Sequence, residues 1–151
     1  MKSIHLVVVG KNKDKAFSLL EKEYQKRLKK MTLKVHELKH HDSKEKNDSQ
    51  VIQKITSLSG RQAPFIVLLD ERGKSFRSKE FSLWLFEHLE SFNNIFFVIG
   101  GAEGHGEEVM RIAKDSIRLS DFTLPHRMAR TLIIEQIYRA ESLHLGHPYH
   151  K

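Results

Sequence analysis

Chemically capable side chains gather in three stretches of the second half of the chain. Residues 147–151, "HPYHK", hold two imidazoles and a phenol, although terminal segments are usually simple and mobile. The stretch "GGAEGHGEE" contains Gly101, Gly104 and Gly106 directly after an apolar run, and "LSDFTLPHRMAR" is an unusually apolar loop around Pro125. Imidazoles exchange protons near neutral pH, and glycines let a backbone approach a ligand closely. These stretches are therefore the candidates for a ligand site.

The glycine stretch is not one of the familiar phosphate-binding motifs. No Gly-Lys-Ser or Gly-Lys-Thr follows it, and its order G-x-x-G-x-G differs from the dinucleotide-binding G-x-G-x-x-G. It can hold a ligand, or it can merely form a tight turn between a strand and a helix. The apolar loop also has two interpretations: Phe122 and Leu124 can form the walls of a site for a flat aromatic ligand such as a purine, or they can pack beneath their neighbours.

The composition excludes several chemistries. The chain has no cysteine, which excludes disulfides, thiolate metal sites and a cysteine nucleophile, and fits a reducing compartment. Its ten histidines show no H-E-x-x-H pattern and no carboxylate spaced to complete a zinc triad, so we expect no metal. The apolar run in "MKSIHLVVVG" is too short for a signal peptide, and no stretch reaches the roughly 20 apolar residues of a membrane span. We therefore expect a soluble cytoplasmic protein.

Positive charge is concentrated in the first third of the chain. The formal net charge is +7; residues 1–54 hold 14 Lys and Arg against 7 Asp and Glu, and the remaining residues hold 12 of each. A basic patch on one face is typical of a protein that binds a polyanion. A lysine-rich helix surface can also serve solubility alone, and charge by itself leaves both interpretations open.

The apolar pattern predicts strands alternating with helices. Strands are expected at residues 4–10, 33–38, 64–70 and 94–100, and a short one within 116–125. Five helices are expected. The first extends from Asp14 to about Met31, the second ends near Leu58, and the third begins at Ser78. The fourth covers residues 106–114, and the last extends for about five turns from Pro125. The polar stretch 39–49 is expected to be a mobile loop, and residues 71–76, "ERGKSF", a second loop.

This alternation indicates an α/β fold, namely a single doubly wound, mainly parallel sheet of about five or six strands with helices on both faces. A chain of 151 residues, 39% of them apolar, is expected to form one domain. Ligands of such sheets bind beyond the C-terminal ends of the strands. Three of these ends fall at residues 69–70, 99–101 and 119–125, which include the glycine stretch and the apolar loop.

Five stretches resemble a known family when they are taken together and in order. They are "VVVGK", "LDERGKSFRSKEF", "FFVIGGAEG", "IRLSDFTLPHRMARTLIIEQIYRA" and "HPYHK", and they extend over nearly the whole chain. The sequence resembles the RlmH-type methyltransferases of the SPOUT class. The resemblance implies S-adenosyl-L-methionine as cofactor and N3 of a pseudouridine in 23S ribosomal RNA as substrate, methylated on assembled ribosomes. The alternatives are a non-catalytic basic α/β protein that binds RNA and a flavodoxin-like nucleotide-binding enzyme.

The resemblance also implies a SPOUT fold with a C-terminal trefoil knot and a homodimer with a composite active site. In this scheme residues 1–151 form one methyltransferase domain, with a basic N-terminal part (1–60) and a cofactor-binding C-terminal part (61–151). Carried over by position, the cofactor-binding residues are Leu69, Gly101, Ser120, Asp121, Phe122, Thr123, Leu124 and Pro125. Asp121 and Phe122 are expected to contribute mainly backbone contacts.

The same resemblance suggests catalytic residues in the C-terminal segment, which would fold over the mouth of the cofactor site. Arg139 and His150 are candidates for stabilising charge on the base or removing its N3 proton, with Tyr149 stacking on the base or bonding to it. Arg139 can equally form an ion pair with Glu135 or lie in a dimer interface. The expected RNA-binding residues are Lys22, Lys26, Arg27, Lys29, Lys30, His126 and Arg130. For His126, a structural contact in the loop is the alternative.

Overall fold

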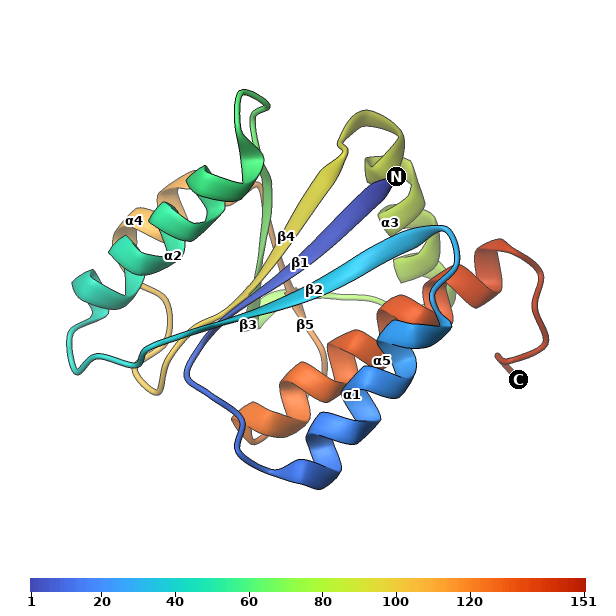
Figure 1. Ribbon diagram of the computed structural model, residues 1–151, viewed down its shortest axis with the longest axis horizontal. Coiled ribbons are helices and arrows are strands. Elements are labelled where there is room, and N and C mark those ends of the chain that lie inside the picture. Colours follow the sequence, from blue (N-terminus) through green and yellow to red (C-terminus); the bar gives the residue numbers. More distant parts are fainter.

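Five strands form one parallel sheet in the order β2-β1-β4-β3-β5 in the computed structural model, which describes residues 1–151 (Figure 1). The strands are β1 (Lys2–Val9), β2 (Met31–Leu38), β3 (Phe65–Ser75), β4 (Asn94–Ile99) and β5 (Asp115–Arg118). β1 lies between β2 and β4, so the basic N-terminal part and the C-terminal part share one sheet. The predicted α/β class is confirmed, with five strands.

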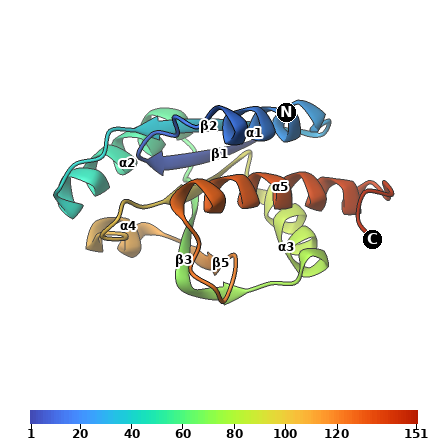
Figure 2. The same ribbon diagram turned by 90° about the horizontal axis from the view of Figure 1, so that it is seen from below.

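Helices cover both faces of the sheet (Figures 1 and 2). They are α1 (Lys15–Arg27), α2 (Lys44–Ser59), α3 (Ser78–Ser91), α4 (Glu107–Ile112) and α5 (His126–His144). Because side chains alternate along a strand, Ile4 and Leu6 of β1 pack with α3 and α5, whereas Val7 and Val9 pack with α2 and α4. The sheet is therefore doubly wound. The trefoil knot stays a prediction.

Helix α1 ends four residues earlier than predicted, at Arg27. The carboxylate of Glu141, which is 2% exposed, accepts hydrogen bonds from the backbone N–H groups of Lys29 and Lys30 at 2.7 and 2.8 Å. This contact from a distant helix holds the chain in a turn, and Met31 becomes the buried first residue of β2. A local apolar spacing could not reveal that a carboxylate 111 residues away ends the helix.

The polar stretch predicted to be a loop contains the first residues of α2. The hydroxyl of Ser43 caps this helix by accepting from the N–H of Lys46, and Asn47 and Asp48 are buried. Polar composition was misleading here because these side chains are hydrogen-bonded in the interior, as described below.

The segment "ERGKSF" is also mostly strand, because β3 continues to Ser75 after a shift in register against β5 between Leu69 and Lys74. Gly73 permits this pairing: a Cβ there would lie 2.6 Å from the backbone nitrogen of Ile117. The extended strand brings the residues after Leu69 to the end of β5. None of the helices is both long and apolar enough to span a lipid bilayer.

Candidate active site

A cleft of about 720 Å³ lies at the C-terminal ends of β3, β4 and β5. Its walls come from the three strand ends named by the sequence, together with the first turn of α5. Of the eight expected cofactor residues, the cleft is lined by Leu69, Gly101, Ser120, Phe122 and Leu124. Asp121, Thr123 and Pro125 belong to the same loop but are exposed beside the cleft.

The glycine loop, residues 100–106, forms one wall of the cleft as a tight turn. The N–H of Gly104 donates to the carbonyl of Gly101 at 2.9 Å, and Gly104 has a φ of 83°, a conformation that favours glycine. His105 is buried and its Nε2 donates to the carbonyl of Leu69 at 2.9 Å. Because a carbonyl only accepts, Nε2 must carry the proton. This bond ties the glycine loop to the end of β3.

The loop from residue 119 to residue 125 forms the opposite wall. The hydroxyl of Ser120 accepts from the N–H of Phe122 at 2.9 Å, and Asp121 pairs with Arg118 at 3.2 Å. The side chain of Phe122 is 83% exposed at the rim. The side chain of Asp121 therefore points to Arg118, and its expected backbone contact with a cofactor stays a prediction.

Asp70 places a carboxylate at the edge of the cleft. Burial alone would raise its pKa, but hydrogen bonds from the side chain and backbone N–H of Arg72 lower the pKa below its usual value. The carboxylate is therefore ionised at neutral pH. An anion in this position suits a ligand that carries positive charge.

The predicted catalytic residues form a second cluster, around the C-terminal half of α5. Arg139 Nη1 donates to His150 Nδ1 at 3.0 Å, and the guanidinium pairs with Glu135 at 2.7 Å. Tyr149 donates from its hydroxyl to Glu135 at 3.1 Å, while its ring lies 4.9 Å from the guanidinium carbon of Arg139. Arg139 thus makes the alternative Glu135 ion pair and contacts the C-terminal segment at the same time.

The hydrogen bonds in this cluster define its protonation. Burial raises the pKa of the Tyr149 hydroxyl far above its usual range, helped by Tyr24 and Glu135, so Tyr149 stays protonated. Since Arg139 can only donate, Nδ1 of His150 is an acceptor, and a neutral ring carries its proton on Nε2. His150 therefore offers a hydrogen-bond donor at Nε2 rather than a base.

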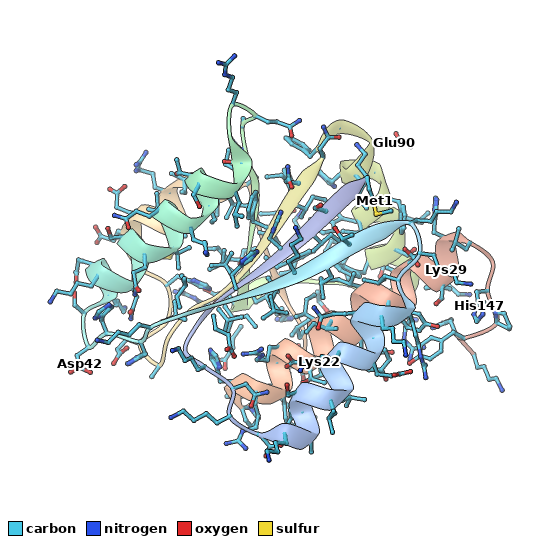
Figure 3. The ribbon with its side chains drawn as sticks, in the orientation of Figure 1. Met1, Lys22, Lys29, Asp42, Glu90 and His147 are labelled. Carbon is cyan, nitrogen blue, oxygen red and sulfur yellow. The ribbon has the colours of Figure 1, made fainter.

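Within one chain, the cleft and the C-terminal cluster lie at opposite ends of α5. Helix α5 begins at the cleft with His126 and ends at His144, and its 19 residues span about 28 Å. In Figure 2 the C-terminus and α4, which follows the glycine loop, lie at opposite ends of the molecule, and Figure 3 shows His147 far from Asp42. Within one chain, the C-terminal segment does not reach the mouth of the cleft, so its expected place over a cofactor site stays a prediction for the dimer.

Most of the predicted RNA-binding residues are exposed. We call Lys22, Lys26, Arg27, Lys29 and Lys30 the α1 basic surface; all five are exposed on α1 and the turn after it, with Lys22 and Lys29 marked in Figure 3. Arg27 pairs with Glu23 at 2.9 Å, and both side chains remain about half exposed. His126 is exposed and lines the cleft, so it lies apart from the α1 basic surface.

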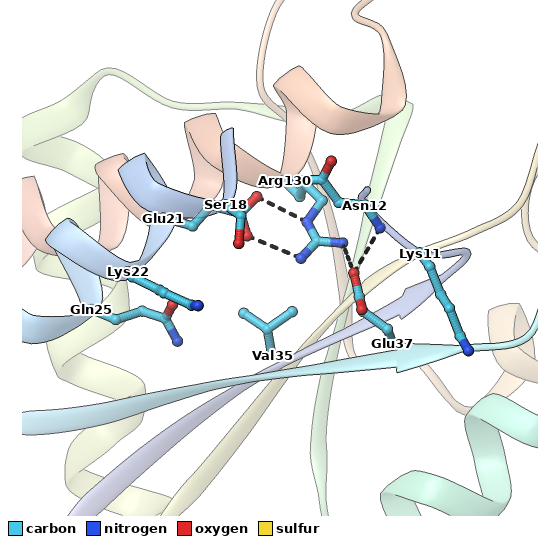
Figure 4. A pocket seen from close by; sticks show the side chains of 9 residues that line it. All are labelled: Lys11, Asn12, Ser18, Glu21, Lys22, Gln25, Val35, Glu37 and Arg130. Carbon is cyan, nitrogen blue, oxygen red and sulfur yellow. Dashed lines mark hydrogen bonds and ion pairs between the residues drawn. The ribbon is translucent and has the colours of Figure 1, made fainter. Parts of the chain in front are cut away.

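Arg130, in contrast, is buried, where it lines a pocket between α1, β2 and α5 (Figure 4). Its guanidinium donates to Glu21 through Nε and Nη2, both at 2.9 Å, and to Glu37 through Nη1 at 2.7 Å. Burial alone would raise the pKa of Glu37, but bonds from Asn12 and Arg130 lower it. The network joins α1, β2 and α5 and holds three of the five N–H donors of Arg130 on carboxylates. No spacing in the sequence identified Glu21 or Glu37 as its partners.

No group of three or more His, Asp or Glu side chains is placed to hold a metal ion. The sequence-predicted cofactor and catalytic residues thus lie in two places, namely the cleft at three strand ends and a cluster of donors at the far end of α5.

A parallel α/β sheet with a cleft beyond the C-terminal strand ends places this chain among the doubly wound α/β proteins, whose ligands bind at this edge of the sheet. Residues 1–150 match a family described as "Predicted SPOUT methyltransferase". The chain belongs to this SPOUT methyltransferase family.

Relatives named "Ribosomal RNA large subunit methyltransferase H" match over nearly their full lengths. The protein of Prochlorococcus marinus (strain NATL2A) is 40% identical over 147 residues, which cover 97% of this chain and 94% of the relative. That of Campylobacter lari is 36% identical over 153 residues (98% and 99%), and that of Koribacter versatilis is 33% identical over 148 residues (97% of each).

Proposed function

We propose that the protein transfers a methyl group from S-adenosyl-L-methionine to N3 of a pseudouridine in 23S ribosomal RNA, on assembled ribosomes in the cytoplasm. The observation that carries the proposal is the cleft at three strand ends in a member of a methyltransferase family. The names of the relatives support large-subunit ribosomal RNA as the substrate. The α1 basic surface supports a polyanionic partner.

The cleft fits a cofactor of this kind. Its volume of about 720 Å³ lies within the usual range of small-molecule sites, and Leu69 and Leu124 offer apolar walls for a purine ring. Gly101 lets the glycine loop pack closely against the β2–α2 connection, because a Cβ there would lie 3.0 Å from the ring of His40. The ionised carboxylate of Asp70 suits a positively charged sulfonium. When bound, the cofactor supplies the electrophilic methyl group.

We further propose a homodimer with composite sites, because the C-terminal cluster and the cleft of one chain are too far apart to act together. Helices α1 and α5 lie side by side and expose four large apolar side chains, Leu19, Leu20, Met128 and Leu145 (Figure 1). A two-fold axis that pairs these faces in antiparallel fashion would bring the end of α5 of one protomer to the start of α5 of its partner. Each cleft would then receive the cluster of the other protomer.

In such a site the C-terminal cluster would stabilise charge on the base. N3 of the pseudouridine must lose its proton before it attacks the methyl group, and negative charge then spreads to the uracil carbonyls. The Nε2–H of His150 and the guanidinium of Arg139 are donors suited to these oxygens. Tyr149, which stays protonated, packs beside the guanidinium and bonds to Glu135. The N3 proton passes to water before this attack, because Arg139, Tyr149 and His150 are all engaged as donors.

Two measurements test the proposal. Calorimetry with S-adenosyl-L-methionine should show binding, whereas FMN and ATP should not bind. Ribosomes from cells that lack the protein should accept labelled methyl groups in 23S ribosomal RNA. Binding to RNA without cofactor affinity would instead support the non-catalytic alternative.

Complementation between two inactive variants tests the composite site. One variant lacks residues 148–151, and the other carries Gly101→Val, whose side chain would collide with His40 and Asn47 and displace the glycine loop from the wall of the cleft. Each should be inactive alone. If the variants form mixed dimers at random, half of the dimers contain one intact site, so an equal mixture should recover about a quarter of wild-type activity. An inactive mixture in which mixed dimers are demonstrated would refute the composite site but leave cofactor binding untouched.

A further inference from the structure

Helix α4 begins at a residue that cannot cap it. Gly106 occupies the N-cap position and has no side chain to accept the first N–H groups of the helix. These groups are nevertheless bonded: Asp48 accepts from the N–H of Gly106 at 2.9 Å and from the N–H of Val109 at 3.1 Å. Asp48 lies on α2 and is only 6% exposed. Its carboxylate therefore caps α4 from another element, where negative charge is favourable.

This cap depends on a glycine at position 106. A Cβ on Gly106 would overlap the carboxylate of Asp48. The backbone of Gly106 itself is ordinary, with φ −85° and ψ 176°, so other residues could adopt it. The requirement for glycine thus comes from the approach of Asp48 and not from backbone strain.

The neighbouring residue Asn47 fixes a second contact of the glycine loop. Its amide bonds to both backbone groups of His41, accepting from the N–H at 2.8 Å and donating to the carbonyl at 3.0 Å. This holds the β2–α2 connection so that the ring of His40 lies against Gly101. One turn of α2 therefore supports the glycine loop at two points, while His105 ties the loop to Leu69 of β3.

We propose that Asp48 is a positioning residue for the cofactor site. By capping α4 through Gly106 and Val109, it holds the glycine loop in the conformation that lines the cleft. Without the carboxylate, two buried N–H groups lose their acceptors, and the loop gains freedom that cofactor binding must remove. The inference rests on the proposed function, because it takes the cleft as the site of S-adenosyl-L-methionine.

Asp48→Ala provides the first test, measured by calorimetry with S-adenosyl-L-methionine. Loss of a helix cap is typically worth about 1 kcal/mol or more, so the dissociation constant should rise about five- to tenfold. In methylation assays KM for the cofactor should rise similarly, while kcat at saturating cofactor stays within about twofold. The matched control is Ile55→Ala on the same helix, which is buried two turns beyond Asp48 and should lower stability but not cofactor affinity.

A rescue variant separates positioning from general destabilisation. In Asp48→Ala/Gly106→Ser, the removed carboxylate leaves room for a serine that can cap α4 locally, and the backbone at 106 already suits a cap residue. Cofactor affinity should return to within about twofold of wild type. Gly106→Ser alone should bind weakly, because the new side chain overlaps Asp48. If Asp48→Ala does not fold, Asp48→Asn replaces it, since its amide can satisfy only one of the two N–H groups.

The outcomes are distinct. Equal losses of affinity in Asp48→Ala and Ile55→Ala, or a double variant no better than Asp48→Ala, would overturn the positioning role. A wild-type protein that does not bind S-adenosyl-L-methionine would instead refute the proposed function.

Discussion

Replacing Arg130 by leucine should destabilise the fold strongly, because it leaves two carboxylates without their cation. Glu21 is the more affected partner: its side chain is 5% exposed and receives two hydrogen bonds from Arg130, whereas that of Glu37 is 33% exposed and can turn towards water. Removing one member of a buried ion pair typically costs 3–5 kcal/mol. Because Glu37 is partly solvated, we expect the free energy of unfolding to fall by about 3 kcal/mol.

Urea unfolding followed by circular dichroism measures this loss, at one fixed protein concentration because a dimer would unfold in a concentration-dependent way. Arg127→Leu is the matched control on the same helix. Arg127 is 56% exposed and reaches Asp14 at 3.3 Å, so its loss should cost less than about 1 kcal/mol. Methylation by Arg130→Leu, assayed where it remains folded, should still occur, because its guanidinium is occupied within the fold.

A double variant distinguishes an unpaired charge from lost packing. Glu21→Leu/Arg130→Leu removes both members of the most buried pair and should recover most of the lost stability, since apolar replacements of a buried pair are often neutral. If Arg130→Leu loses no more stability than Arg127→Leu, or if the double variant is less stable than Arg130→Leu, the reasoning from burial is wrong.

Three further predictions concern other parts of the molecule. Changing all five cations of the α1 basic surface to Glu should weaken ribosome binding and flatten its dependence on salt; unchanged binding and methylation would exclude this surface as the RNA contact. Burial, with His5 beside it, lowers the pKa of His36 from 6.5 to about 4. Because the unfolded chain then binds the proton more readily, the free energy of unfolding should fall as the pH drops from 6.5 to about 4. Urea titrations at pH 7 and 4.5 should show a smaller fall for His36→Phe than for the wild type. Gly73→Ala should lower the melting temperature, because its Cβ would meet the backbone of Ile117; an unchanged value would show that the β3–β5 pairing can shift.

The apolar pattern was a good guide wherever structure depends on local periodicity. The strand cores, the alternation with helices and the parallel sheet followed from buried apolar runs, since a strand covered on both faces needs them. The cleft followed as well, because parallel strands place their C-terminal ends at one edge. Errors arose where distant polar contacts set the local structure, as at the end of α1, where Glu141 holds the turn, and in the first turn of α2.

The sequence by itself determined the class of fold, the edge of the sheet that carries the cleft, and, through its five motifs, the family. Only the tertiary structure decided which charged groups face solvent: Arg130 and the α1 lysines look alike in the sequence, yet the arginine is enclosed by Glu21 and Glu37. It also separated the C-terminal cluster from the cleft by the length of α5 and brought Asp48 to Gly106 across 58 residues. The physical reason is that periodicity reports burial along one element, whereas ion pairs, caps and composite sites depend on how elements pack in space.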